Sequence, residues 1–267
     1  ARFTAPVNDP DPRIQALYDP KAFEHHKTTH GGVDYFWKGN TSRDQNSGVV
    51  MGYALAFEAL GSAKHKKMIQ QDMVAFCTEL MTERKNYPIN LRVKFQGKWQ
   101  DIPLTITSRY MVLNKTEYKG GKAWAEIDPD DVEGGAMAGF REYWPDYSDV
   151  LKQIPLIGGI LGAIPIPRSG STIMLGAIFN TCLMVTQNDP GYAKQHAAIK
   201  AFYDKHVGGW LAKMKQYIVL NAGYPKCWDS YYGLNIVFEP VYNLVRLESD
   251  AKRRASFQKD VPAARAP

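Results

Sequence analysis

The chain has 267 residues, of which 45% are hydrophobic and 22% are charged, so it can bury a sizeable core. Its three cysteines lie far apart without CxxC spacing, which excludes zinc–cysteine and c-type haem sites. The net charge of +6 favours acidic partners such as anionic glycans, but no nucleic-acid-binding motif is present and we expect no specific nucleic-acid partner.

The chain ends and the hydropathy pattern bear on localisation. No stretch reaches the roughly 18 to 20 uncharged apolar residues of a transmembrane helix, so none is predicted. The opening "ARFTAPVNDPDP" is polar and rich in proline, as at the start of a mature chain after removal of a signal peptide. We therefore expect an extracellular or periplasmic protein.

The first part of the chain divides into an arm and a helical hairpin. Residues 1–40 carry four prolines and are expected to be a loop-rich N-terminal arm. Ser47–Leu60 is apolar nearly all round, which predicts an interior helix. Ala63–Arg84 is amphipathic, with apolar residues at spacings of three and four, and predicts an outer helix capped by Ser62.

An insertion with a different sequence pattern follows at residues 89–169. The segment Ile89–Thr107 alternates apolar and polar residues around Gln96-Gly97, which predicts a small β-hairpin with strands near Leu91–Phe95 and Lys98–Ile106. Residues 108–169 are rich in glycine, proline and aspartate, and we expect them to be irregular.

Helical patterns return after the insertion. Ser171–Gln187 is apolar all round and is predicted to be an inner helix. The segment from Pro190 to about Leu220 is amphipathic, with an expected break at Gly208-Gly209. Tyr231–Leu247 is a third inner-type helix containing Pro240, and a charged outer helix follows it.

Alternation of apolar inner helices with amphipathic outer helices predicts the fold class. We expect a single all-α domain over residues 1–267, built as an α/α-hairpin array or partial toroid with the β-hairpin as an insertion. In such an array, the loops that precede the inner helices gather at one end and line a funnel. The polar clusters ahead of the three inner helices would then form a site.

Two runs carry a family resemblance. Trp37–Gly48 reads "WKGNTSRDQNSG" and Ser230–Glu248 reads "SYYGLNIVFEPVYNLVRLE". Both resemble runs in a group of uncharacterised secreted bacterial proteins, and the hairpin arrangement is similar to the six-hairpin glycosidase-like toroids. That superfamily includes glycoside hydrolases and polysaccharide lyases that often bind substrate at the inner-helix loops. The resemblance thus implies a carbohydrate-active enzyme.

The predicted catalytic residues are a pair of aspartates. Asp44 would act as a general acid or base, and Asp229 would be its partner, since glycosidases use two carboxylates roughly 5 to 10 Å apart. The alternative for Asp44 is a helix cap beside Arg43, whose guanidinium would pair with a carboxylate. Glu58 and Glu239 lie on inner helices, and either projects into the funnel or forms a salt bridge in the core.

The predicted substrate-binding residues surround these aspartates. His26 and His30 have the spacing of a metal pair on a helix, but the glycines and threonines around them favour a loop, so we expect a substrate or structural histidine and no metal or cofactor. The substrate-binding set is Trp37, Arg43, Gln45, Tyr231, His30 and Arg168.

A second function class stays open beside the enzyme. No P-loop, nucleophile elbow or HExxH motif is present. The apolar segment Ile154–Pro167 is too short to span a membrane and is a candidate for self-association. The chain is therefore predicted to be a secreted glycoside hydrolase or polysaccharide lyase acting on a glycan, or else a non-catalytic surface or assembly protein.

Overall fold

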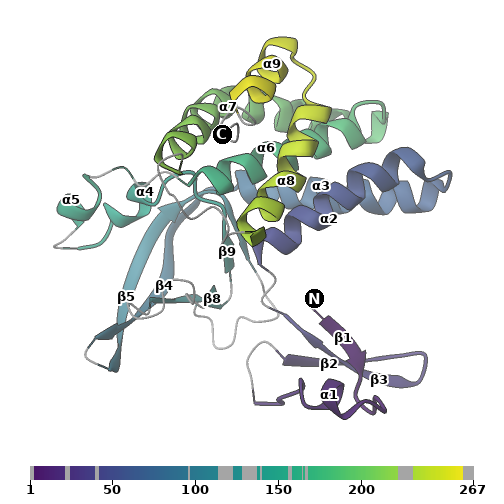
Figure 1. Ribbon diagram of the computed structural model, residues 1–267, viewed down its shortest axis with the longest axis vertical. Coiled ribbons are helices and arrows are strands. Elements are labelled where there is room, and N and C mark those ends of the chain that lie inside the picture. The colour runs from purple at the N-terminus through teal and green to yellow at the C-terminus, as the bar shows by residue number, and fades with distance from the viewer. Residues whose placement is uncertain are drawn as a thin grey trace. The chain divides into compact units, whose positions relative to one another are not determined.

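The computed structural model describes residues 3–21, 25–39, 42–95, 97–113, 123–127, 137–138, 140–155, 158–163, 165, 168–221 and 231–260. Helices make up 56% of the structure and strands 22%, with the strands in three small sheets (Figure 1). The prediction of an all-α fold is therefore wrong, because the chain is mixed α and β. Within these ranges no helix is both long enough and apolar enough to cross a membrane.

The chain divides into two compact units. One, here called the strand unit, comprises Ala1–Gln45, Pro88–Leu104 and Leu113–Arg141. The other, here called the helical unit, comprises Asn46–Tyr87, Thr105–Val112 and Glu142–Pro267.

The first forty residues contain a three-stranded antiparallel sheet where a loop-rich arm was expected. The strands are β1 (Phe3–Pro6), β2 (His25–His30) and β3 (Val33–Lys38), in the order β1-β3-β2. Gly31 and Gly32 have φ angles of 58° and 78°. Two successive residues with positive φ form the tight turn that closes β2 onto β3. Glycines that indicate a loop also suit such a hairpin turn, and this is why the expectation is wrong.

The predicted hairpin is confirmed, because its two strands are neighbours in one sheet, and both strands are longer than expected. Gln96 of the predicted turn lies outside the described residues. The two strands are β4 (Arg84–Phe95) and β5 (Lys98–Ser108). Two further strands extend this sheet in the order β5-β4-β7-β8, namely β7 (Ala123–Ile127), which runs parallel to β4, and β8 (Met137–Ala138).

The segment 108–169, expected to be irregular, contributes other short elements. These are β6 (Met111–Leu113) and β9 (Phe140–Glu142), which form a two-stranded sheet, and the helices α4 (Ser148–Leu151) and α5 (Gly158–Leu161). A four-residue helix α1 (Pro12–Gln15), capped by Asp11, follows β1.

The long helices agree with the predicted periodicity. They are α2 (Arg43–Ala59), α3 (Ala63–Met81), α6 (Ser169–Thr186), α7 (Ala193–Asn221), α8 (Tyr231–Leu247) and α9 (Ala251–Asp260), with a 3₁₀ turn η2 (Pro190–Tyr192) before α7. One boundary differs, because α7 continues unbroken through Gly208-Gly209. Neither glycine has a positive φ angle, so both fit the helix without strain.

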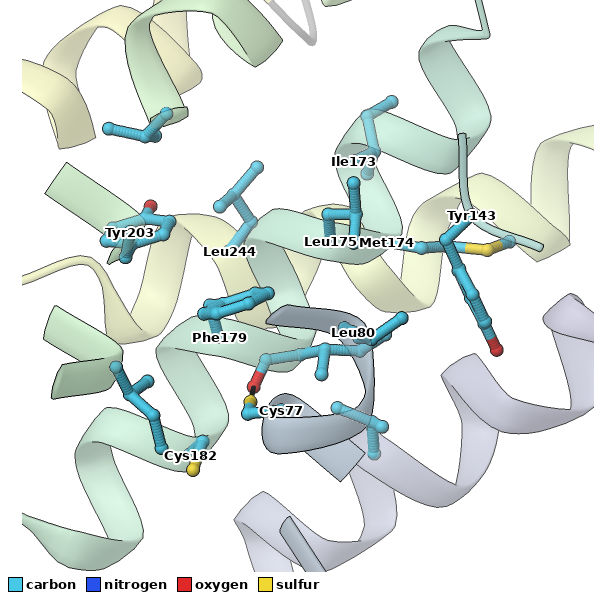
Figure 2. Close-up of a cluster of buried hydrophobic side chains, with 14 of the residues drawn as sticks. Cys77, Leu80, Tyr143, Ile173, Met174, Leu175, Phe179, Cys182, Tyr203 and Leu244 are labelled. Atoms are coloured by element: carbon cyan, nitrogen blue, oxygen red, sulfur yellow. Dashed lines mark hydrogen bonds between the residues drawn. The ribbon is translucent and has the colours of Figure 1, made fainter. Parts of the chain in front are cut away.

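Helix α6 is the centre of the helical unit, where it packs against α3, α7 and α8 (Figures 1 and 2). Leu175, Phe179 and Cys182 of α6 are completely buried, so the prediction of an inner helix is confirmed for α6. It is wrong for α2, where Val49 is 51% exposed and Leu55 is 40% exposed. A helix that is apolar all round can still have one face in solvent, since apolar surface residues are common.

A buried polar network joins α9 to the other helices. Glu248, which follows α8 and is completely buried, accepts hydrogen bonds from the Tyr203 hydroxyl at 2.6 Å and from the Arg253 guanidinium at 3.1 Å. Asn180 of α6 donates to the Tyr203 hydroxyl at 3.1 Å. Because buried polar groups are costly without partners, this network fixes how α9 docks.

Candidate functional site

The predicted site begins with the residues that open α2. The backbone N–H of Ser42 donates to Gln45 Oε1 at 3.0 Å, and the N–H of Gln45 donates to Ser42 Oγ at 3.5 Å. This reciprocal pair is a capping box, which satisfies two N–H groups that a helix start otherwise leaves unpaired. The structure thus gives the predicted substrate residue Gln45 a local structural role.

Arg43 and Asp44 occupy the first and second positions of α2. Ser42, not Asp44, stands at the cap position, so the cap role weighed for Asp44 falls to its neighbour. The side chain of Asp44 and the whole of Asp229 lie outside the described residues, so their catalytic pairing stays a prediction.

Trp37 and His30 lie on the β2–β3 hairpin. The Trp37 ring stacks on His26, its partner across the two strands, with ring centroids 4.1 Å apart. His26 and His30 share a face of β2, but four residues of extended strand separate them by about 13 Å. They therefore cannot bind one metal ion together, and Trp37 and His30 do not converge.

Arg168 and Tyr231 belong to the helical unit. The Arg168 guanidinium lies over the Tyr147 ring, 4.3 Å from its centroid, just before α6 begins. Tyr231 is the first residue of α8, and its side chain lies outside the described residues.

The two glutamates of the inner-type helices have partners. Glu58 forms an ion pair with Arg246 at 2.5 Å, so the predicted salt bridge is present, but it lies at the surface and not in the core, because the Glu58 side chain is 47% exposed. Glu239 accepts a hydrogen bond from the Ser47 hydroxyl at 3.3 Å, beside Gly48. In the described part of the chain, no group of three or more metal-ligating side chains is found.

The helical unit contains a pocket that the sequence did not indicate. It has a volume of about 340 Å³, within the range of small-molecule sites. It lies at the C-terminal ends of α2 and α6 and the N-terminal end of α3, whereas the prediction placed the site before the inner helices. The lining residues of this pocket, here called the α2–α3–α6 pocket, are Phe57, Glu58, Lys66, Gln70, Met184, Val185, Gln187, Asn188 and Asp189.

Local sequence explains how the pocket forms. Gly61 and Ser62 end α2 and cap α3, and the resulting hairpin brings Phe57 opposite Lys66, whose Nζ lies 5.2 Å from the Phe57 ring centroid. Buried Gln70 fastens α3 to the end of α6 by donating to the Val185 carbonyl at 2.8 Å.

Both carboxylates of the pocket are balanced by cations. Glu58 is paired with Arg246. Asp189 lies 4.0 Å from Lys67 and accepts the Gly191 N–H at 2.8 Å. Half-buried Lys66 has no carboxylate partner among the described residues, so the pocket holds one uncompensated positive charge.

The position of Lys66 on its helix adds to the positive electrostatic potential of the pocket. Lys66 lies in the first turn of α3, which contains no acidic residue. The N-terminal end of a helix carries a partial positive charge and favours acidic side chains, so lysines there are unfavourable by a few tenths of a kcal/mol or more. A negatively charged group bound beside Lys66 would therefore be favourable.

Comparison with known proteins does not assign the chain to a family. No family model matches it, and no curated protein or solved structure gives a match.

Proposed function

We propose that the protein is carbohydrate-active and that the α2–α3–α6 pocket binds an acidic sugar residue of an anionic glycan. The observation that carries the proposal is Lys66, a half-buried cation without a carboxylate partner in the described residues, beside the aromatic ring of Phe57. A sugar carboxylate would supply the missing negative charge, and charge-assisted hydrogen bonds are the stronger ones in proteins.

The other lining residues suit a sugar for separate reasons. Gln187 and Asn188 are exposed amides that can donate to and accept from hydroxyl groups. The Phe57 face offers an apolar surface for a sugar ring once Lys66 turns toward the carboxylate. The overall charge of +6 would also attract a polyanionic chain at low ionic strength.

The test compares acidic and neutral ligands. Binding of an oligogalacturonide and of the matched neutral galacto-oligosaccharide is measured by calorimetry at fixed salt, for the parent and for Lys66→Gln. We expect the parent to prefer the acidic ligand, and Lys66→Gln to weaken that binding about tenfold or more while leaving weak neutral binding unchanged.

The matched control is Lys64→Gln. Lys64 lies in the same turn of α3, is exposed and does not line the pocket. An equal loss of binding in both variants would indicate general attraction to a basic surface and would overturn the pocket assignment. Absence of binding to any glycan by the parent would overturn the carbohydrate proposal and favour the assembly class, for which Ile160 of α5, 74% exposed, is the first residue to test.

A further inference from the structure

Two cysteines of the helical unit lie on neighbouring helices in its core. Cys77 of α3 and Cys182 of α6 are both completely buried and belong to the same hydrophobic cluster (Figure 2). Both are thiols in this structure. The sequence places them far apart, so only the packing of α3 on α6 brings them together.

Two contacts fix the register of these helices. Gln70 of α3 bonds to the carbonyl of Val185, and the Cys77 sulfur lies 3.9 Å from the carbonyl oxygen of Ile178. The earlier residue of α3 meets the later residue of α6, so the two helices run antiparallel. In an α-helix the carbonyl of Ile178 accepts the N–H of Cys182, four residues later. The Cys77 sulfur thus lies at the turn of α6 that leads to Cys182.

Side-chain direction brings the two sulfurs closer. Each Cα–Cβ bond in a helix tilts toward the N-terminus of that helix. Because α3 and α6 are antiparallel, Cys77 and Cys182 lean in opposite directions, and each leans toward the level of the other. The two thiols are near enough that Cys182 raises the pKa of Cys77.

We propose that Cys77 and Cys182 form a disulfide bond that joins α3 to α6 when the protein folds under oxidising conditions. The bond would close a loop of about one hundred residues, and long loops are where a disulfide restricts the unfolded chain most. It would join two of the three helices that line the α2–α3–α6 pocket. This inference does not depend on what the pocket binds.

The reaction needs a disulfide donor, such as oxidised glutathione. The thiolate of one cysteine attacks the donor, forms a mixed disulfide and releases one glutathione thiol. The thiolate of the other cysteine then attacks the protein-bound sulfur, which forms the Cys77–Cys182 bond and releases the second glutathione thiol. The two protein thiols lose two protons and two electrons, and the donor disulfide gains them.

Burial determines when this exchange can occur. Burial raises the pKa of the Cys77 thiol well above its ordinary value, and the neighbouring Cys182 thiol raises this pKa further. The reactive thiolate is therefore scarce in the folded protein. The bond should form during folding, before α3 closes on α6, and only slowly once the reduced protein has folded.

The test follows the thiols by mass spectrometry. The full chain is refolded in a glutathione redox buffer, free thiols are alkylated, and the protein is digested without reduction. We expect a linked pair of peptides containing Cys77 and Cys182, two hydrogens lighter than the separate peptides, with Cys227 alkylated. The reduced folded protein in the same buffer should give this pair at least tenfold more slowly.

Matched variants distinguish the Cys77–Cys182 disulfide from the other possible cysteine pairings. Cys227→Ser should keep the linked peptides, and Cys182→Ala should abolish them. The melting temperature of oxidised Cys227→Ser should fall by about 5 °C or more on reduction, while that of Cys182→Ala should not change. Alkylation of both Cys77 and Cys182 in the refolded parent, or a bridge from either to Cys227, would overturn the proposal without recourse to any variant.

Discussion

Ser42 and Gln45 explain most of the polar cluster that opens α2. The spacing Ser-x-x-Gln is a capping-box signature that is visible in the sequence alone. It accounts for the serine and the amide without any ligand, and Trp37 is accounted for by its stacking on His26. Of the predicted site, only the start of the helix could be found from residue types, because a capping box depends on four consecutive positions.

Asp44 gives the first test at this scale. As the second residue of α2 it places a negative charge at the positive end of the helix, which stabilises by about 0.3 to 1 kcal/mol. We expect Asp44→Asn to lower the free energy of unfolding by no more than about 1 kcal/mol, measured by urea denaturation, and to leave acidic-glycan binding unchanged. Ser42→Ala is the control, with an expected loss of about 1 kcal/mol from the cap. If the parent turns over a glycan and Asp44→Asn slows it a hundredfold at normal stability, Asp44 is catalytic as first predicted.

At the scale of the elements, two glycines in helices differ sharply in what surrounds them. A Cβ atom at Gly176 of α6 would lie 2.7 Å from Leu244 Cδ1 of α8. A Cβ atom at Gly208 of α7 would meet nothing within 4 Å. The first glycine is needed for close packing of α6 on α8, whereas the second only adds backbone freedom to the unfolded chain.

Substitution by alanine should therefore have opposite effects at these positions. Gly176→Ala should lower the free energy of unfolding by about 1 to 3 kcal/mol, because Leu244 must leave its position in a filled core. Gly208→Ala should raise it by about 0.4 to 1 kcal/mol, since alanine is the better helix former. Both are measured by urea denaturation. A stable Gly176→Ala protein would mean that Leu244 can move aside, and the close contact would then not determine the packing of α8.

The long helices could be predicted because periodicity is a local property of the sequence. The strands β1 to β3 could not, since their glycine turn and prolines equally indicate a loop, and pairing with distant residues decides between them. Burial was also only partly predictable. Helices α2 and α6 are both rich in apolar residues, but only α6 has neighbours on all sides, and this depends on tertiary packing.

For the whole molecule, the α2–α3–α6 pocket shows why a site can escape sequence analysis. Its residues come from three helices and from the segment that follows α6, and Lys66 belongs to the short basic run at 64–67, which resembles an ordinary solvated helix face. A lysine without a carboxylate partner is recognisable only once the positions of Arg246 and Lys67 are known. The signal present in the sequence was the placement of lysines at a helix start, where acids are preferred.

The buried network of Glu248 links stability of the helical unit to alkaline pH. Burial raises the pKa of Tyr203 well above its ordinary value of 10.0, and the neighbouring Glu248 carboxylate raises it further. Burial also raises the pKa of Tyr110 to about 12. The pKa of Tyr53 is raised to about 12, mainly by its hydrogen bond to Asp72.

These shifts predict that the protein loses stability above about pH 10. A tyrosine whose pKa is higher in the folded state keeps its proton there while the unfolded chain has released it. Its contribution is thus fully present below the unfolded pKa and is lost as the pH rises toward the folded pKa. For buried Tyr203 the slope is at most about 1.4 kcal/mol per pH unit.

The free energy of unfolding, measured in urea from pH 8 to 11, should fall in the parent and fall less steeply in Tyr203→Phe. Tyr203→Phe is also expected to be less stable at pH 8, because Glu248 loses a donor, so the slope and not the absolute value is diagnostic. Tyr53→Phe, which removes a more exposed hydroxyl, should change the slope less than Tyr203→Phe does. Equal slopes in the parent and Tyr203→Phe would show that Tyr203 does not couple the network to pH.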